Sequence, residues 1–187
     1  MTNDERRRKS ECPMTKSHRA HGRVSSFELR HSFDIRHSGL VILPMPYHYL
    51  EEIGTADIAF EATGRDLPEL FMAAADATMN VMIDNLDAIE SRETRHIELA
   101  NDKLDMLLFD FLQEFVYFKD AERLLLRVCE MSIDEKDGKF FLKAKTVGEL
   151  LHAARHHQRA DVKAVTLHGF SVEKQDDGWK ARVLLDI

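Results

Sequence analysis

The chain has 187 residues, of which 44% are hydrophobic and 32% charged, and its formal net charge at pH 7 is −7. This size and composition are typical of one ordinary soluble domain with an extension. No run of about 18 apolar residues is present, which excludes a membrane-spanning helix, and the basic N-terminus lacks the apolar segment of a secretory signal. Cys12 and Cys129 are far apart and form no disulfide framework or cysteine-rich zinc site, so we expect a protein of the reducing cytoplasm.

Charge divides the chain into two unequal parts. Residues 1–43 contain nine Lys and Arg against five acids, and the remainder contains 17 Lys and Arg against 28 acids. Because the first part also has few apolar residues, we predict a basic flexible extension over 1–43 and a single folded domain over 44–187. The extension is either a weak arm for a partner or dispensable sequence, and translation starting at Met45 is an alternative. The acidic domain disfavours tight nucleic-acid binding and suits a metal ion or a basic protein partner.

The domain opens with a predicted strand and helix. Residues 58–62 alternate as a strand does, which puts Asp57 at the mouth of the strand, as a turn residue or as part of a shared site. A helix follows, because Asp66 is a suitable N-cap, Pro68 lies in the first turn and Glu69 stands three residues after the cap. Apolar residues then recur at helical spacing as far as Met82.

A second strand and helix are predicted next. The strand covers 94–99, and the helix runs from about Asn101, a candidate N-cap, to about Lys119, with a wide apolar face. Four further strands are expected over 124–133, 139–147, 162–172 and 179–187, with tight turns at Asp137-Gly138 and Asp177-Gly178. The order of helices and hairpins predicts an α+β fold, with two helices packed on a mostly antiparallel sheet.

The motifs of common enzymes are missing from the sequence. No Gly-x-Ser-x-Gly elbow and no glycine loop for phosphates or dinucleotides is present, and Cys129 falls within a predicted strand. His152 and His156 have the i, i+4 spacing of zinc ligands, with His157 and His168 nearby, but no glutamate follows the first histidine. We therefore favour a polar loop over one end of the sheet for the histidines rather than a zinc site.

The end of the chain concentrates oxygen ligands. Asp186 and the carboxylate of Ile187 follow one another at the end of a predicted strand, and Lys163 stands at the entry of another. With Asp57 these carboxylates suit a hard divalent cation. Spacing alone favours the simpler interpretation, in which they are unrelated solvated acids at strand ends.

Four stretches of the domain, taken together, resemble the archease family. They are the Thr-Ala-Asp motif that ends at Asp57, the Lys-Asp-Ala-Glu turn 119–122, the run Val-Lys-Ala-Val-Thr-Leu-His at 162–168, and the chain end 178–187. They follow the family's order from about Tyr47 to Ile187, and the lysine run combined with a final Asp-Ile is the specific part. The resemblance implies an archease-like fold. Three positions depart from the usual pattern: Gly54 and Lys119 replace histidines, and Leu167 replaces a tyrosine.

The resemblance also implies a function in RNA processing. Archeases are not enzymes themselves but activate the GTP-dependent, RtcB-type RNA ligase of tRNA splicing and RNA repair, by promoting its guanylylation and turnover. The family's metal site carries over to Asp57, Asp186 and Ile187, and its functional lysine carries over to Lys163. The implied cofactor is a divalent cation, Ca²⁺ first, with Mg²⁺ or Mn²⁺ as alternatives, and RNA is contacted only through the ligase. The alternative is a chaperone-like modulator of a tRNA-modifying enzyme such as a tRNA methyltransferase.

Overall fold

A computed structural model describes residues 46–50 and 57–187 of the chain. The predicted extension over 1–43 and the departure at Gly54 lie outside these residues. Within these residues the elements are two α-helices, a 3₁₀ turn and seven strands. In chain order they are β1 Tyr47–Tyr49, β2 Asp57–Gly64, α1 Leu67–Met82, η1 Leu86–Ala88, β3 Glu93–Asn101, α2 Leu104–Glu122, β4 Leu124–Lys136, β5 Lys139–Leu150, β6 Ala164–Gln175 and β7 Gly178–Asp186.

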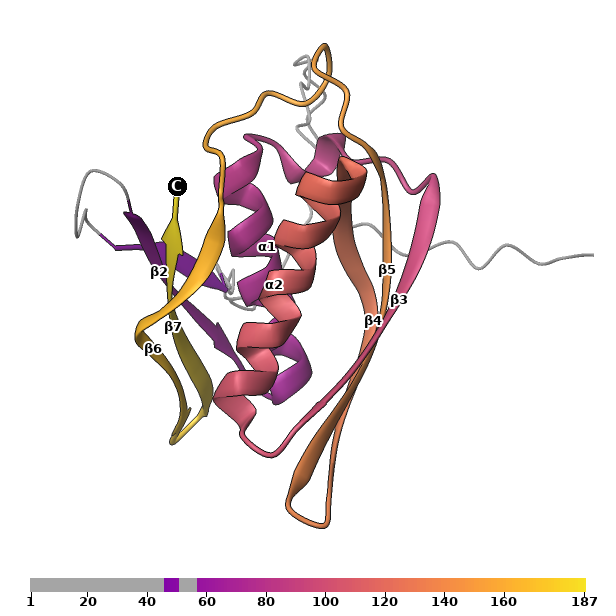
Figure 1. Ribbon diagram of the computed structural model, residues 1–187. Helices are drawn as coiled ribbons and strands as arrows, with labels where there is room; N and C mark the ends of the chain where they lie inside the picture. The colour runs from indigo at the N-terminus through magenta and orange to yellow at the C-terminus, as the bar shows by residue number, and fades with distance from the viewer. Residues whose placement is uncertain (1–45, 51–56) are drawn as a thin grey trace, which may run out of the picture.

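The strands form two sheets with the helices between them (Figure 1). One sheet has the order β1-β2-β7-β6, the other has the order β3-β5-β4, and all neighbouring strands of the described residues are antiparallel. Both helices contact strands of both sheets. The predicted α+β class is therefore confirmed, although the strands divide between two sheets rather than forming one.

The hydrophobic core fills the layers on both sides of the helices, and its largest fully buried side chains are aromatic. Figure 1 shows α1 and α2 side by side, and Phe71 of α1 meets Phe111 of α2 with ring centroids 6.0 Å apart. Phe111 in turn packs edge-on against Phe115. The fully buried large side chains include Phe60, Phe71, Phe111, Phe115, Leu70, Met79 and Met82.

No helix in the described part of the chain is long and apolar enough to cross a membrane.

The predicted start of α1 is confirmed, and that of α2 is wrong. The Asp66 carboxylate accepts a hydrogen bond of 2.9 Å from the Glu69 N–H, as an N-cap should. Asn101 instead ends β3, where it pairs with Phe140 across the ladder. Its side chain accepts from the Lys103 N–H at 3.1 Å, so it closes the turn before the helix while the strand holds its backbone extended.

A long crossing segment, residues 151–163, connects β5 to β6 over the C-terminal end of α1. The last carbonyl groups of a helix have no partner inside it. Here the Arg159 N–H donates to the Met82 carbonyl at 3.0 Å, and the Ala160 N–H donates to the Val81 carbonyl at 3.2 Å. The crossing segment therefore completes the end of α1, and α1 fixes the course of the segment towards β6.

Candidate functional site

Strand pairing brings three of the residues singled out in the sequence to one end of the four-stranded sheet. Asp57 opens β2 and lies directly opposite Asp186, which ends β7. On its other side Asp186 lies opposite Ala164, the first residue of β6. The residue before it, Lys163, donates its backbone N–H to the Asp186 carbonyl at 2.9 Å. Residues more than 100 positions apart in the sequence thus meet at one end of the sheet, which is called the edge of the site below.

The two acids lie on the face of the sheet that is turned away from the helices. Side chains alternate between the faces of a strand, and the neighbouring residues Val183 and Leu185 are fully buried in the core. Asp186 therefore belongs to the opposite face, together with Asp57. Directly opposed residues have Cβ atoms about 5 Å apart, so the two half-buried carboxylates are close neighbours.

Lys163 brings a positive charge to the same end. Its ammonium nitrogen donates to the main-chain oxygen of Ile187 at 3.0 Å, and its side chain is exposed. In a chain that ends at Ile187 this oxygen belongs to the terminal carboxylate. The end of β7 is thus flanked by an acid pair on one side and by a solvent-accessible ammonium group on the other.

The donor set at this edge fits a hard cation only when the oxygen atoms of Ile187 take part. Within residues 46–50 and 57–187, no three His, Cys, Asp or Glu side chains gather as metal ligands do. Asp57 and Asp186 therefore supply two carboxylates, and the Ile187 main chain, directly after Asp186, is a third source of oxygen. All of these donors are oxygens, which match Ca²⁺, Mg²⁺ or Mn²⁺ rather than zinc.

One further polar group lies on this face. Thr166 is opposite Leu184, two residues along β6 from Ala164, and its side chain belongs to the same face of the sheet as Asp186. Its hydroxyl is buried and has no hydrogen-bond partner, the single such side-chain atom recorded for the described residues. A buried unpaired hydroxyl is unfavourable, so this face has a donor and acceptor to offer beside the acid pair.

A largely buried lysine pairs with two more exposed acids, one of them close to Lys163 in the chain. The Lys119 ammonium, at the end of α2, donates to Asp120 at 2.7 Å and also to Asp161 in the crossing segment. Lys119 is only 9% exposed. Burial alone would lower the pKa of Lys119, but its hydrogen bonds to the two carboxylates outweigh that effect and raise the pKa. Its hydrogen bond in turn lowers the pKa of Asp161, and Lys163 contributes in the same direction.

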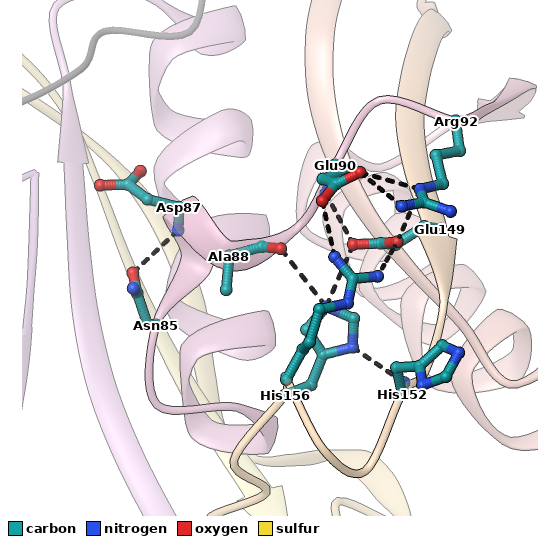
Figure 2. Close-up of polar contacts among 9 residues, drawn as sticks. Asn85, Asp87, Ala88, Glu90, Arg92, Glu149, His152 and His156 are labelled. Atoms are coloured by element: carbon teal, nitrogen blue, oxygen red, sulfur yellow. Dashed lines mark hydrogen bonds and ion pairs between the residues drawn. The ribbon is translucent and has the colours of Figure 1, made fainter.

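The histidine segment has a structural role, shown in Figure 2. The His152 N–H donates to Nδ1 of His156 at 2.9 Å, so Nδ1 bears no proton and the proton lies on Nε2. Nε2 faces a Glu149 oxygen at 3.2 Å and the Ala88 carbonyl at 3.4 Å. Both ring nitrogens of the buried His156 are therefore engaged within the protein. The segment is the predicted polar loop, except that His168 lies in β6.

Glu149 is the centre of this cluster and was not singled out in the sequence. Its side chain is 3% exposed, and its carboxylate accepts from the Glu90 N–H at 2.9 Å and from Arg155. The Nε atom of Arg92 lies 3.2 Å from Oε2 of Glu149, the oxygen that also accepts from Arg155. Burial raises the pKa of Glu149, but the hydrogen bonds from Arg155 and from the Glu90 N–H outweigh it and lower the pKa. An acid within an otherwise apolar stretch of strand was the signal that could have indicated this cluster.

Comparison with known proteins agrees with this architecture. The model of the Archease protein family matches residues 47–187. The chain belongs to the archease family. It is 37% identical over 134 residues to protein archease of Pyrococcus abyssi, an alignment that covers 71% of this chain and 94% of that protein. With protein archease of Methanosarcina acetivorans the identity is 38% over 144 residues, covering 75% of this chain and 95% of the relative.

Solved structures give the same result. The solution structure of Methanobacterium thermoautotrophicum protein 1598 is 35% identical and superposes with a TM-score of 0.67, over 76% of this archease and 99% of that protein. A Thermotoga maritima archease, described as a possible chaperone, matches with a TM-score of 0.50 at 20% identity, over 75% and 98% of the two chains. The resemblance inferred from the sequence motifs is therefore confirmed, and so is the archease-like fold.

Proposed function

We propose that this archease is a non-catalytic activator of an RtcB-type, GTP-dependent RNA ligase in tRNA splicing or RNA repair, and that it acts in the cytoplasm. The observation that carries the proposal is the meeting of Asp57, Asp186 and Lys163 at the end of β7. These are the residues for which the sequence motifs imply the family's metal and partner functions. This end of the sheet combines a half-buried acid pair with an exposed ammonium group, and such charged groups suit contact with a second protein.

The cation, Ca²⁺ first, would be held by the Asp57 and Asp186 carboxylates together with the chain end at Ile187. When bound, it would neutralise the acid pair at the end of β7. The protein supplies the frame on which these oxygens converge, because burial of Val183 and Leu185 sets the register of β7. Mg²⁺ or Mn²⁺ would use the same oxygen donors.

Lys163 is the residue proposed to act on the ligase. Its ammonium is accessible beside the chain end, and it can pair with a phosphate or a carboxylate group in the partner. The surrounding domain is acidic, with 28 acids against 17 Lys and Arg after residue 43. This charge opposes direct contact with RNA, so RNA is reached through the ligase.

The test is guanylylation of the RtcB-type ligase from the same organism, followed by multiple-turnover RNA joining, with and without this archease and Ca²⁺. We expect the wild type to stimulate both steps, and Asp186→Asn and Lys163→Met to lose the stimulation. Asp134→Asn and Lys143→Met are matched controls, because both residues are exposed on the other sheet. Full stimulation by both site variants would reject the role of this edge, and no stimulation by the wild type would reject the ligase as partner.

A second candidate function is suggested by the Thermotoga maritima relative, which is described as a possible chaperone. In that case this archease would assist a tRNA-modifying enzyme such as a tRNA methyltransferase. The chain exposes some large apolar side chains that such binding could use, among them Tyr117 and Leu167, each 57% exposed. Higher methyltransferase activity in the presence of the wild type and of Asp186→Asn alike, without ligase stimulation, would favour this function.

A further inference from the structure

The crossing segment that delivers Lys163 to the site is held by side chains at only a few points after it leaves α1. Backbone hydrogen bonds tie Arg159 and Ala160 to the end of α1. Beyond them, the fully buried side chain of Val162 anchors the segment in the core. The carboxylate of Asp161 points the other way and pairs with Lys119 of α2. The course of the chain into Lys163 therefore depends on Asp161 as well as on the core.

Lys119 pairs with Asp161 for an electrostatic reason. Its side chain is 9% exposed, whereas that of Asp161 is 76% exposed. A buried ammonium group needs anionic partners because it has lost most of its water. Asp120 provides one partner from the helix itself, and Asp161 provides the other from the crossing segment. The lysine thus recruits Asp161 as its second anionic partner.

Asp161 is also a potential competitor for Lys163. The two residues flank the fully buried Val162 and both are exposed, so both side chains lie on the solvent side of the chain. Lys163 already lowers the pKa of Asp161, so its ammonium is within electrostatic reach of that carboxylate. Lys163 nevertheless donates its side-chain hydrogen bond to Ile187. The Asp161 carboxylate is occupied by Lys119 at the same time.

We propose that Lys119 is a positioning residue of this archease: by occupying the Asp161 carboxylate, it leaves the Lys163 ammonium directed to the end of β7. Without Lys119, the freed Asp161 carboxylate pairs with Lys163 and withdraws it from Ile187. The ammonium then no longer faces a partner at the edge. The consequence for the ligase rests on the proposed function, but the position of Lys163 can be measured without the ligase.

The test removes the charge of Lys119 alone, or the charges of Lys119 and Asp161 together. Lys119→Met removes the ammonium and leaves Asp161 free, whereas Lys119→Met combined with Asp161→Asn removes the ammonium and the competitor together. Lys119→Arg keeps the charge. Lys145→Met, which breaks the 2.8 Å ion pair with Glu130 on the other sheet, is the matched control for loss of a lysine.

The first readout is ligase stimulation, and the second is the NMR signal of the Lys163 side-chain methylene next to the ammonium. For Lys119→Met we expect roughly tenfold or greater loss of stimulation, because small displacements of a positioned functional group have effects of this size. We also expect the NMR signal of the Lys163 methylene to shift. The double variant should recover most of the stimulation and the wild-type signal, and Lys119→Arg and Lys145→Met should behave as the wild type. A purely structural role for Lys119 would leave the double variant as impaired as Lys119→Met.

The two readouts separate this inference from the proposed function. If the wild type does not stimulate the ligase, the proposed function is rejected, while the Lys163 signal still tests the role of Lys119. An unshifted Lys163 signal in a folded Lys119→Met variant would overturn the inference. A shifted signal that the second substitution fails to restore would overturn it as well.

Discussion

Asp186→Asn should change the stability of this archease in opposite directions with and without the cation. The substitution removes one charge and preserves the size of the side chain. Asp186 faces Asp57 across the β2–β7 pair, and both side chains are half-buried. In the absence of a cation the variant should therefore be more stable than the wild type, because it relieves repulsion between two neighbouring carboxylates.

The size of this effect follows from the geometry. Two like charges about 5 Å apart repel by about 0.8 kcal/mol at the dielectric constant of water, and by about 3 kcal/mol at an effective value of 20. The ammonium of Lys163 at the end of β7 offsets part of the repulsion. We therefore expect a gain near the lower limit, about 1 kcal/mol, in cation-free buffer.

Adding the cation should reverse the order of the two proteins. A ligand that binds only the folded state at a free concentration 100 times its Kd stabilises that state by about 2.7 kcal/mol. The wild type would gain this free energy, whereas the variant, which lacks one anionic ligand, would gain little. The wild type should then be more stable by about 1.5 to 2 kcal/mol.

Urea unfolding measures the reversal directly. The unfolding midpoints of wild type, Asp186→Asn and the control Asp134→Asn are compared in EDTA and in Ca²⁺. A shifted midpoint reports a change in stability when the slope of free energy against urea concentration is the same for the proteins compared. Asp134 lies on the other sheet, so its substitution should leave the calcium response intact. An equal calcium response in wild type and Asp186→Asn would refute the assignment of Asp186 as a ligand.

Three other predictions concern Glu149, Thr166 and Ile187. Glu149→Gln should cost about 2 to 3 kcal/mol at pH 7, because it breaks a buried, multiply hydrogen-bonded carboxylate, while Glu90→Gln, at a 54% exposed side chain, should cost under about 1 kcal/mol. Since the pKa of Glu149 is lowered on folding, its contribution is complete above about pH 4.3 and is lost as the pH falls through the folded-state pKa. Urea midpoints across this range should show the gap between wild type and Glu149→Gln closing, and a constant gap would contradict the assignment. Thr166→Val should stabilise the protein by about 1 kcal/mol in a thermal melt, because it removes a buried hydroxyl without a partner; a loss of stability would mean that the hydroxyl is satisfied. A peptide tag fused after Ile187, but not one fused before Met1, should weaken Ca²⁺ binding in calorimetry, and unchanged affinity would exclude the chain end as a ligand.

The elements that the sequence predicts well are those set by local chemistry. The start of α1 follows from Asp66 and Glu69, which interact within one helical turn. The turn at Asp137-Gly138 is likewise local, since both residues have positive φ, 54° and 74°. Prediction from local sequence fails for Asn101, because an asparagine side chain serves equally well to cap a helix or to close a turn after a strand. Pairing of Asn101 with Phe140, 39 positions away, decided between the two.

The candidate site depends on contacts that no local pattern contains. Asp57 and Asp186 meet only because β7 lies between β2 and β6, an order that the sequence alone left open. Family resemblance, rather than spacing, supplied that grouping. Lys119 and Asp161 are a similar case, since they are 42 positions apart. Lys119 was noted in the sequence only at a helix end and as a replacement for a histidine, and Asp161 was an acid in a polar segment, so nothing local indicated that the crossing segment makes them partners.

The register of β7 links the hydrophobic core to the site. Val183 and Leu185 are fully buried between the sheet and the helices, and Asp186 is the next residue. Because side chains alternate, a slip of one residue would carry Asp186 into the core and Leu185 to the outer face, exchanging two favourable environments for two unfavourable ones. The apolar residues of β7 therefore hold the acid opposite Asp57 even without a cation. A cation would then bind an arrangement that the core has already formed, so its binding energy is not spent on ordering the strand.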